Sequence, residues 1–305
     1  FISAQGFAKV SMATVLIGAI INIVLDPVFI FLFHLEVQGA AIATVLSQAV
    51  SAIWVMRFLL KGQSTLKIRR KNLRLQASTI LPVLALGVSP FIMQSTESLL
   101  NIAFNSSLQR YGGDLAVGAM TILSSLMQVL NMPLTGLTQG AQPIISFNYG
   151  AGNRERVAKA FRLLIIAAVG FSTLFWAVVQ LFPSIFVMIF NNDPELMEFT
   201  VWAAHIYFGT AFLLGAQTGC QQTFLAVGQA KVSLFLALLR KVILLIPIIY
   251  ILPLFFENKV FAVFVAEPVA DTIAVISTVT LFSWQFRKIL REMDRKDKQK
   301  SPALK

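Results

Sequence analysis

The sequence predicts an all-α protein that crosses a membrane several times, and three observations lead to this fold class. Hydrophobic residues fill 57% of the 305 positions and charged residues only 13%, against about 25% charged in an ordinary soluble domain. The mean hydropathy is +0.76. The apolar residues also form runs long enough to cross a bilayer, which takes about 20 mostly apolar residues in a helix.

Eight such runs follow one another along the chain. The fourth and the sixth are longer than one crossing requires, so we expect these two helices to tilt or to protrude from the membrane. The predicted spans cover residues 11–33, 39–60, 78–105, 114–147, 161–182, 198–226, 232–256 and 260–285.

The net charge of +11 comes from basic residues that lie between these runs. The segment from Arg57 to Arg74 carries seven basic residues and no acid. The connection after the fourth run and the C-terminal tail are also basic, whereas the alternate connections carry acidic residues. Because cytoplasmic loops of membrane proteins are rich in Lys and Arg, this alternation predicts that both ends of the chain are cytoplasmic. The same pattern argues against a nucleic acid partner, because the basic residues are placed as membrane-topology signals.

A short pattern, Gly-x-Ala-Lys-Val-Ser, opens two of the apolar runs. It begins at Gly6 and again at Gly228, 222 residues later. This internal repeat predicts that one structural unit occurs twice, with 11–33 equivalent to 232–256 and 39–60 equivalent to 260–285. If each unit has six helices, the chain holds the last two helices of one unit and a complete second unit. We then expect about 140–150 further residues ahead of Phe1.

Four stretches resemble the MATE (multidrug and toxic compound extrusion) transporters, most closely their MepA-like bacterial branch. NIVLDPVFIF at 22–31 and QGAAIATVLSQ at 38–48 resemble the fifth and sixth helices of that family. QGAQPIISFNYGAGNRERVAKAFR at 139–162 resembles the end of the eighth helix and the following loop. AVGQAKVSLFLALLRKVILLIPIIYILP at 226–253 resembles the eleventh helix. The resemblance covers nearly the whole chain, without counterparts of helices one to four.

The resemblance implies a twelve-helix transporter whose two lobes enclose a cavity that opens alternately to each side. It implies export of bulky cationic and amphipathic drugs across a bacterial plasma membrane, driven by inward movement of protons or sodium ions. No cofactor is expected, and the partners would be small-molecule drugs and lipids around a monomer. The domains would be a partial N-lobe at 1–60, a basic cytoplasmic linker at 61–77, a six-helix C-lobe at 78–286 and a basic cytoplasmic tail at 287–305.

Glu97 is the first candidate for coupling to cations, because a carboxylate within a membrane span is costly and is usually functional. It shares one predicted helix face with Gln94, Ser98 and Asn101, at spacings typical of a helix. In several MATE relatives an acidic residue of this helix takes part in cation binding, so the resemblance implies the same role for Glu97. A structural hydrogen-bonding role is the alternative.

Three further carboxylates are candidates for the same role. Glu267 and Asp271 lie one helical turn apart, and two like charges at that spacing favour protonation of one of them, which suits a proton carrier. Alternatively, both face water near the outer mouth. Asp26 precedes Pro27 and is a coupling candidate as well, although it could equally cap the backbone opened by the proline.

Polar amides and methionines within the spans could line a drug cavity or hold helices together. These candidates, beside the face of Glu97, are Gln128, Asn131, Gln217, Gln221, Met93 and Met127. Arg240 and Lys241 lie about two turns into their helix, and we expect them to extend back to the cytoplasmic interface. His34, His205 and Cys220 lack partners at metal-ligand spacing, so no metal site is expected.

Other function classes fit the sequence less well. A lipid-linked oligosaccharide flippase of the same superfamily would need a strongly cationic cavity, and few basic residues lie within the spans. A membrane enzyme is disfavoured because the chain contains neither HExxH nor Gly-x-Ser-x-Gly. A non-functional fragment of a transporter stays open, because two helices of a first lobe leave a central cavity with only one complete wall.

Overall fold

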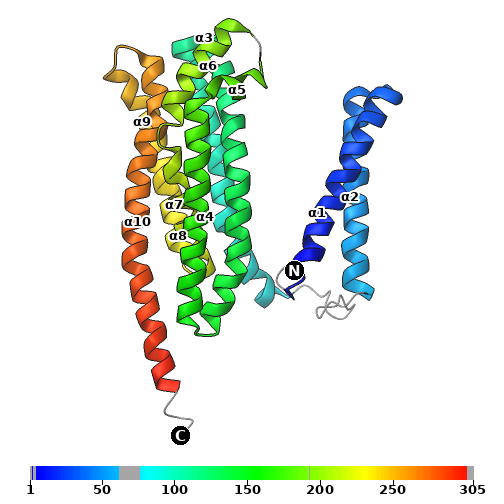
Figure 1. Cartoon of the computed structure of the whole chain (residues 1–305), viewed down its shortest axis with the longest axis vertical. Helices are drawn as coiled ribbons and strands as arrows, with labels where there is room; N and C mark the ends of the chain where they lie inside the picture. The colour runs from blue at the N-terminus through cyan, green and yellow to red at the C-terminus, as the bar shows by residue number, and fades with distance from the viewer. Residues whose placement is uncertain (1, 3–4, 62–75, 192, 301–305) are drawn as a thin grey trace. The chain divides into compact units, whose positions relative to one another are not determined.

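The computed structural model describes residues 2, 5–61, 76–191 and 193–300, and every regular element within them is helical. The chain forms two compact units, Phe1–Ile80 and Leu81–Lys305 (Figure 1). Most of the predicted linker at 61–77 and the end of the predicted tail, 301–305, lie outside the described residues.

The first unit is a helical hairpin. It consists of α1 (Ala8–Pro27), a π-helical turn η2 (Val28–Leu32) and α2 (Glu36–Lys61). Small residues let the helices approach each other closely: the Ser51 hydroxyl donates to the Thr14 carbonyl at 3.1 Å, and Gly39 lies directly against the backbone of Phe29. Asp26 lies near the end of α1, where its carboxylate accepts a hydrogen bond from the Asn22 amide at 3.1 Å.

The second unit begins with α3 (Ala77–Gly150), whose 74 residues contain a reversal. A straight helix of that length would extend about 110 Å, far more than the roughly 30 Å of a bilayer core. The reversal is at Gly113, whose φ of 62° and ψ of −156° are essentially accessible only to glycine. The two arms of α3 run in opposite directions (Figure 1). The predicted spans at 78–105 and 114–147 therefore lie in separate arms.

The rest of the second unit is a succession of helices, several of them interrupted. They are α4 (Arg154–Leu181), α5 (Pro183–Met188), α6 (Pro194–Tyr207), η4 (Ala211–Leu213), α7 (Leu214–Ala226), α8 (Ala230–Leu238), η5 (Leu239–Leu245), α9 (Ile246–Ile251), η6 (Leu252–Leu254) and α10 (Lys259–Lys300).

The predicted span at 198–226 corresponds to two helices, α6 and α7, with a bend of 48° between Tyr207 and Ala211. Helix α6 also begins earlier than predicted, at Pro194, since the Asp193 carboxylate accepts hydrogen bonds from the backbone N–H groups of Glu195 and Leu196. Within the described residues, six helices are long and apolar enough to cross a membrane, or up to seven if the bent pair counts as one span.

The internal repeat appears in the backbone. Gly6 and Gly228 adopt nearly the same left-handed conformation, with φ of 86° and 81°. The next residues match as well: Phe7 has φ −85° and ψ 53°, and Gln229 has φ −90° and ψ 47°. Each turn leads directly into a helix, α1 or α8. The two copies of the pattern thus build the same helix entry.

Two apolar clusters form the core of the second unit. One surrounds Phe208 and Phe264, and the other contains a stack in which the rings of Phe282 and Phe286 lie 4.8 Å apart. Large apolar side chains such as Ile166 and Leu254 point outward, as expected of helices that face lipid. Among the described residues, the buried charged side chains are Glu267 and Asp271 of α10.

Candidate functional site

Arg240 forms ion pairs with two carboxylates inside the second unit. Its Nε donates to Oδ1 of Asp271 at 2.5 Å, and its Nη2 donates to Oε1 of Glu267 at 3.3 Å. Asp271 is only 1% exposed and Glu267 only 6%. Both carboxylates belong to α10, one turn apart, so a single guanidinium can reach both with its planar set of donors.

Lys241 forms a second ion pair, with a carboxylate that comes much earlier in the sequence. Its ammonium group contacts a carboxylate oxygen of Glu97, which lies in the first arm of α3. The Glu97 side chain is 48% exposed, whereas that of Lys241 is 18% exposed. Successive helical residues point about 100° apart, which explains how neighbours reach different helices. Both basic residues belong to the π-helical turn η5, a type of irregularity that is frequent at functional sites.

These ion pairs lie well away from the ends of the helices that carry them. Arg240 is ten residues beyond the start of α8 at Ala230, which corresponds to a rise of about 15 Å. Asp271 is twelve residues beyond the start of α10 at Lys259, or about 18 Å. Arg240 and Lys241 extend to carboxylates of other helices, so the expectation that they extend back to the interface is wrong.

The five charged groups leave a formal excess of one negative charge, because three carboxylates face two basic residues. An uncompensated charge inside a membrane protein costs several kcal/mol, at roughly 3 kcal/mol or more near the bilayer centre. A bound cation or proton would neutralise the excess. We call this group of Glu97, Arg240, Lys241, Glu267 and Asp271 the charge cluster.

A small polar cavity of about 90 Å³ lies beside Arg240 and Lys241. The Gln221 side-chain amide donates to the Ser233 carbonyl at 3.2 Å. The side-chain oxygen of Gln217 is buried and accepts no hydrogen bond within the described residues. The cavity is lined by Thr96, Gln217, Gln221, Ala237, Arg240 and Lys241.

The sequence candidates fall at different places. Glu97, Glu267 and Asp271 are in the charge cluster, and Gln217 and Gln221 line the cavity beside it. Since Glu267 and Asp271 are buried in the protein, the alternative that they face water is wrong. The other candidates on α3 with exposed side chains are Gln94, Ser98, Asn101, Gln128 and Asn131.

The remaining candidates are less connected to the cluster. Met127 packs partly buried against the core, and the side chain of Met93 lies outside the described part of the structure. Asp26 belongs to the first unit. Among the described residues, no group of three or more His, Cys, Asp or Glu side chains is arranged to hold a metal ion.

Sequence reasoning missed Arg240, Lys241 and Thr96 as members of the site. A usable signal existed for the two basic residues, since opposite charges in neighbouring apolar spans stabilise each other when paired. A basic residue near a helix end can also be hydrated by extending to water. The apolar pattern does not distinguish a hydrated side chain from a buried ion pair. Thr96 is a single uncharged residue within the predicted span at 78–105, and nothing in the sequence distinguishes it as a site residue.

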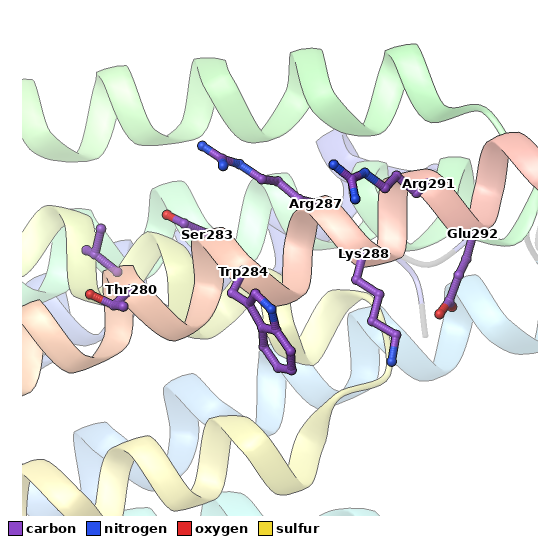
Figure 2. A pocket seen from close by; sticks show the side chains of 8 residues that line it. Thr280, Ser283, Trp284, Arg287, Lys288, Arg291 and Glu292 are labelled. Atoms are coloured by element: carbon purple, nitrogen blue, oxygen red, sulfur yellow. The ribbon is translucent and has the colours of Figure 1, made fainter.

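A wider, shallow groove of about 780 Å³ follows the far end of α10 and is separate from the charge cluster. Arg287 and Arg291 lie on one side of the helix and Trp284 and Lys288 on the other (Figure 2). Trp284 is 66% exposed. An exposed tryptophan next to basic residues is typical of the boundary between membrane and water.

Comparison with known proteins places this chain in a family. The sequence profile of the MatE family matches residues 90–251, which is more than half of the chain. The chain belongs to the MatE family. Multidrug export protein MepA of Staphylococcus haemolyticus is 24% identical over 286 residues, covering 92% of this chain and 62% of that protein. MepA of Staphylococcus aureus is 25% identical over 281 residues, covering 90% and 61%.

Solved structures of MatE family transporters share the fold. The MATE multidrug transporter DinF-BH in complex with R6G superposes with a TM-score of 0.79 and 38% identity, covering 90% of this chain and 61% of that one. A MOP superfamily transporter from Pyrococcus furiosus reaches a TM-score of 0.85 at 22% identity, covering 94% and 64%. The chain thus spans about three fifths of the length of these relatives. It is a helical, multi-pass membrane protein of the MatE family.

Proposed function

We propose that the protein containing this chain is a secondary active multidrug exporter. It exchanges cationic, amphipathic drugs for protons or sodium ions, and its two lobes open alternately to the two sides of a bacterial plasma membrane. The observation that carries the proposal is the charge cluster within apolar helices, with an excess negative charge, in a member of the MatE family. The relatives named multidrug export proteins support the substrate class.

We assign eight spans to this chain, counting the two arms of α3 and the bent pair as three of them. Two come from the first unit, and six come from the two arms of α3, α4, the bent pair α6 and α7, the segment α8 to η6, and α10. We assign the first pair to the end of an N-lobe and the other six to a complete C-lobe. The positive-inside rule then puts both ends of the chain in the cytoplasm.

The mechanism follows from competition between positive charges for the carboxylates. Glu97 is half exposed and offers a counter-charge to a cationic drug. Glu267 and Asp271 are buried, and the coupling cation competes with Arg240 for these two carboxylates. When one carboxylate gains a proton, it loses its attraction to Arg240, and the helices that carry the two groups can separate. A ligand shifts such an equilibrium only through its different affinity for the two states, which the changing ion pairs supply.

Drug contacts beyond the counter-charge come from polar and flexible side chains. Gln94, Ser98 and Asn101 lie on exposed positions around Glu97, and Gln128 and Asn131 are exposed on the second arm of α3. Met93 and Met127 are the adaptable apolar contacts, because a thioether side chain accommodates ligands of different shapes. Asp26 is a further coupling candidate in the first unit.

A flippase for lipid-linked oligosaccharides is less well supported. A pyrophosphate group requires free basic residues, and both Arg240 and Lys241 are engaged by carboxylates. The excess negative charge of the cluster would repel such a substrate. A non-functional transporter fragment is the remaining alternative, and it predicts that cells expressing the chain do not extrude drugs.

Ethidium efflux from cells that express the protein containing this chain tests the proposal. Glu97→Gln and Glu267→Gln should each abolish most efflux, because each removes a negative charge from the cluster. Glu292→Gln, at an exposed position on the far end of α10, is the matched control and should keep normal efflux. Efflux at the normal rate in both cluster variants would show that transport does not use these carboxylates, and no efflux from the unaltered protein would favour the fragment.

A further inference from the structure

The ion pair between Lys241 and Glu97 joins an exposed position to a partly buried one. Glu97 is half open at the surface of the second unit, and Lys241 reaches it from η5, where the lysine also lines the polar cavity. The carboxylate offered to a cationic drug is therefore already occupied by an ammonium group of the same protein.

We propose that Lys241 is a built-in competitor of the substrate, and thus a residue that determines specificity. Its ammonium group holds Glu97 while the site is empty, and a cationic substrate must displace it. The inference rests on the proposed function, because it takes Glu97 to be the counter-charge of the drug.

A tethered lysine is well suited to this role. Its ammonium is a compact charge on a flexible chain of four carbons, so it can leave one partner for another without moving the backbone. Tethering gives it an effective concentration on the order of millimolar, so a free cation must bind Glu97 better than the ammonium does in order to replace it. A neutral compound gains nothing from displacing the lysine. The competition therefore favours large, weakly hydrated cations, whose aromatic parts add contacts that the ammonium lacks.

The cavity provides a place for the displaced ammonium. Lys241 and Gln217 line the same space of about 90 Å³, larger than the roughly 30 Å³ that a water molecule occupies in the liquid. Gln217 is only 2% exposed, and its side-chain oxygen is a buried acceptor with no donor among the described residues. A buried acceptor of this kind is stabilised by any donor that reaches it. Lys241 also stays within the attraction of Glu267 and Asp271.

Two positions are thus available to one ammonium group. In the first it neutralises Glu97, and in the second it donates to the Gln217 oxygen while Glu97 binds the drug. Removal of the lysine should strengthen the binding of cations, and removal of the acceptor should weaken it. These opposite signs separate the proposal from a purely structural ion pair, whose loss would weaken binding in either case.

Binding of two probes to the purified, full-length protein in nanodiscs tests this inference. Tetraphenylphosphonium is the cation, and triphenylphosphine oxide is a neutral compound of similar shape. Lys241→Met should bind the cation roughly threefold to tenfold more tightly, with the neutral probe unchanged, because the competing ion pair is gone. Lys241→Arg should weaken cation binding, since a guanidinium holds a carboxylate with two hydrogen bonds. Gln217→Leu should weaken it too.

Two controls complete the experiment. Lys231→Met removes a basic residue of α8 that is exposed, and it should leave both affinities unchanged. In a Glu97→Gln background, Lys241→Met should no longer improve cation binding. Unchanged or weaker cation binding in Lys241→Met, or equal shifts for both probes, would overturn the inference while leaving the proposed function intact. If the unaltered protein binds neither probe, the proposed function and the inference both fail.

Discussion

Arg240 is the residue on which the interior of the second unit depends most. Its guanidinium engages Asp271 through Nε at 2.5 Å and Glu267 through Nη2 at 3.3 Å. A lysine could not hold two carboxylates with the same fixed geometry. The shorter contact fixes Asp271, so Glu267 is the carboxylate that can be released from the arginine with the smaller loss of hydrogen bonding.

Arg240→Gln should therefore destabilise the protein strongly. The substitution leaves two buried carboxylates without a positive partner, and breaking a buried ion pair on one side typically costs about 3–5 kcal/mol. We expect a clear decrease of the thermal unfolding midpoint in detergent. The midpoint is measured as the temperature at which the monodisperse peak in size-exclusion chromatography is lost.

The matched control is a variant without any of the three charges. Arg240→Gln combined with Glu267→Gln and Asp271→Asn should recover most of the lost stability, because no group in it is left charged and unpaired. If the triple variant is no more stable than Arg240→Gln alone, the loss comes from packing of the arginine and not from its charge.

At this scale, the sequence predicted the acidic half of the charge cluster and missed the basic half. Glu97, Glu267 and Asp271 stand out because carboxylates are rare in apolar spans. Arg240 and Lys241 lie about three turns from the start of α8, and a long basic side chain there can be satisfied either by extending to water or by a buried partner. Which outcome holds depends on the π-helical turn η5, which directs the side chains and leaves no mark in the apolar pattern.

Close packing between α4 and α7 is the clearest constraint at the scale of elements. A Cβ atom on Gly215 of α7 would lie 2.5 Å from the Ser172 hydroxyl oxygen and closer still to the carbonyl of Ala168. The same serine hydroxyl donates to the Phe212 carbonyl at 2.9 Å. Small residues at such contacts let helices in membranes approach each other, where no hydrophobic effect drives them together.

Gly215→Ala should separate α4 from α7 and destabilise the second unit by about 1–3 kcal/mol, the usual cost of overpacking a close contact. Gly170→Ala is the matched control on α4, because a Cβ there meets no atom within 4 Å. Its effect should be neutral or slightly stabilising, since alanine is the better helix former. Thermal unfolding of the two variants in the same detergent measures the difference, and equal midpoints would show that the α4–α7 contact adapts freely.

Helix interruptions were harder to predict than helix existence. The run at 198–226 was predicted from its mean apolarity, which does not report the direction of the backbone, so it gave no sign of the 48° bend between α6 and α7. The N-terminal boundary at Pro194 was predictable, because an aspartate followed by proline is a typical helix start. The reversal at Gly113 agrees with the predicted gap between the third and fourth spans, which Arg110 and Asp114 mark in the sequence.

At the scale of the whole molecule, the internal repeat connects the two units. Gly6 and Gly228 adopt the same left-handed conformation, and each precedes a pair of helical segments. Gly6 is followed by α1 and α2, and Gly228 is followed by the segment α8 to η6 and then by α10. The sequence predicted this equivalence from six letters, because a turn that requires a glycine at a fixed place leaves a recognisable pattern. It could not predict the side-chain contacts within each unit, since the repeat constrains backbones and not contacts.

Membrane topology gives a test of the whole arrangement. The single cysteine, Cys220, is buried, so Cys220→Ala provides a background without reactive thiols. Arg156→Cys lies at the start of α4 and Glu257→Cys directly precedes α10, and both positions are exposed. Between them the chain contains α4, the bent pair α6 and α7, and the segment α8 to η6.

If the bent pair crosses the membrane, three spans separate the two positions and they must lie on opposite sides; if it does not, two spans separate them and they lie on the same side. Because Arg156 belongs to a basic connection and Glu257 to an acidic one, the positive-inside rule places Arg156→Cys in the cytoplasm. An impermeant maleimide should therefore label Glu257→Cys in intact cells and Arg156→Cys only after permeabilisation. Labelling of neither or both in intact cells would leave α6 and α7 as a re-entrant pair, and the reversed result would place both ends of the chain outside.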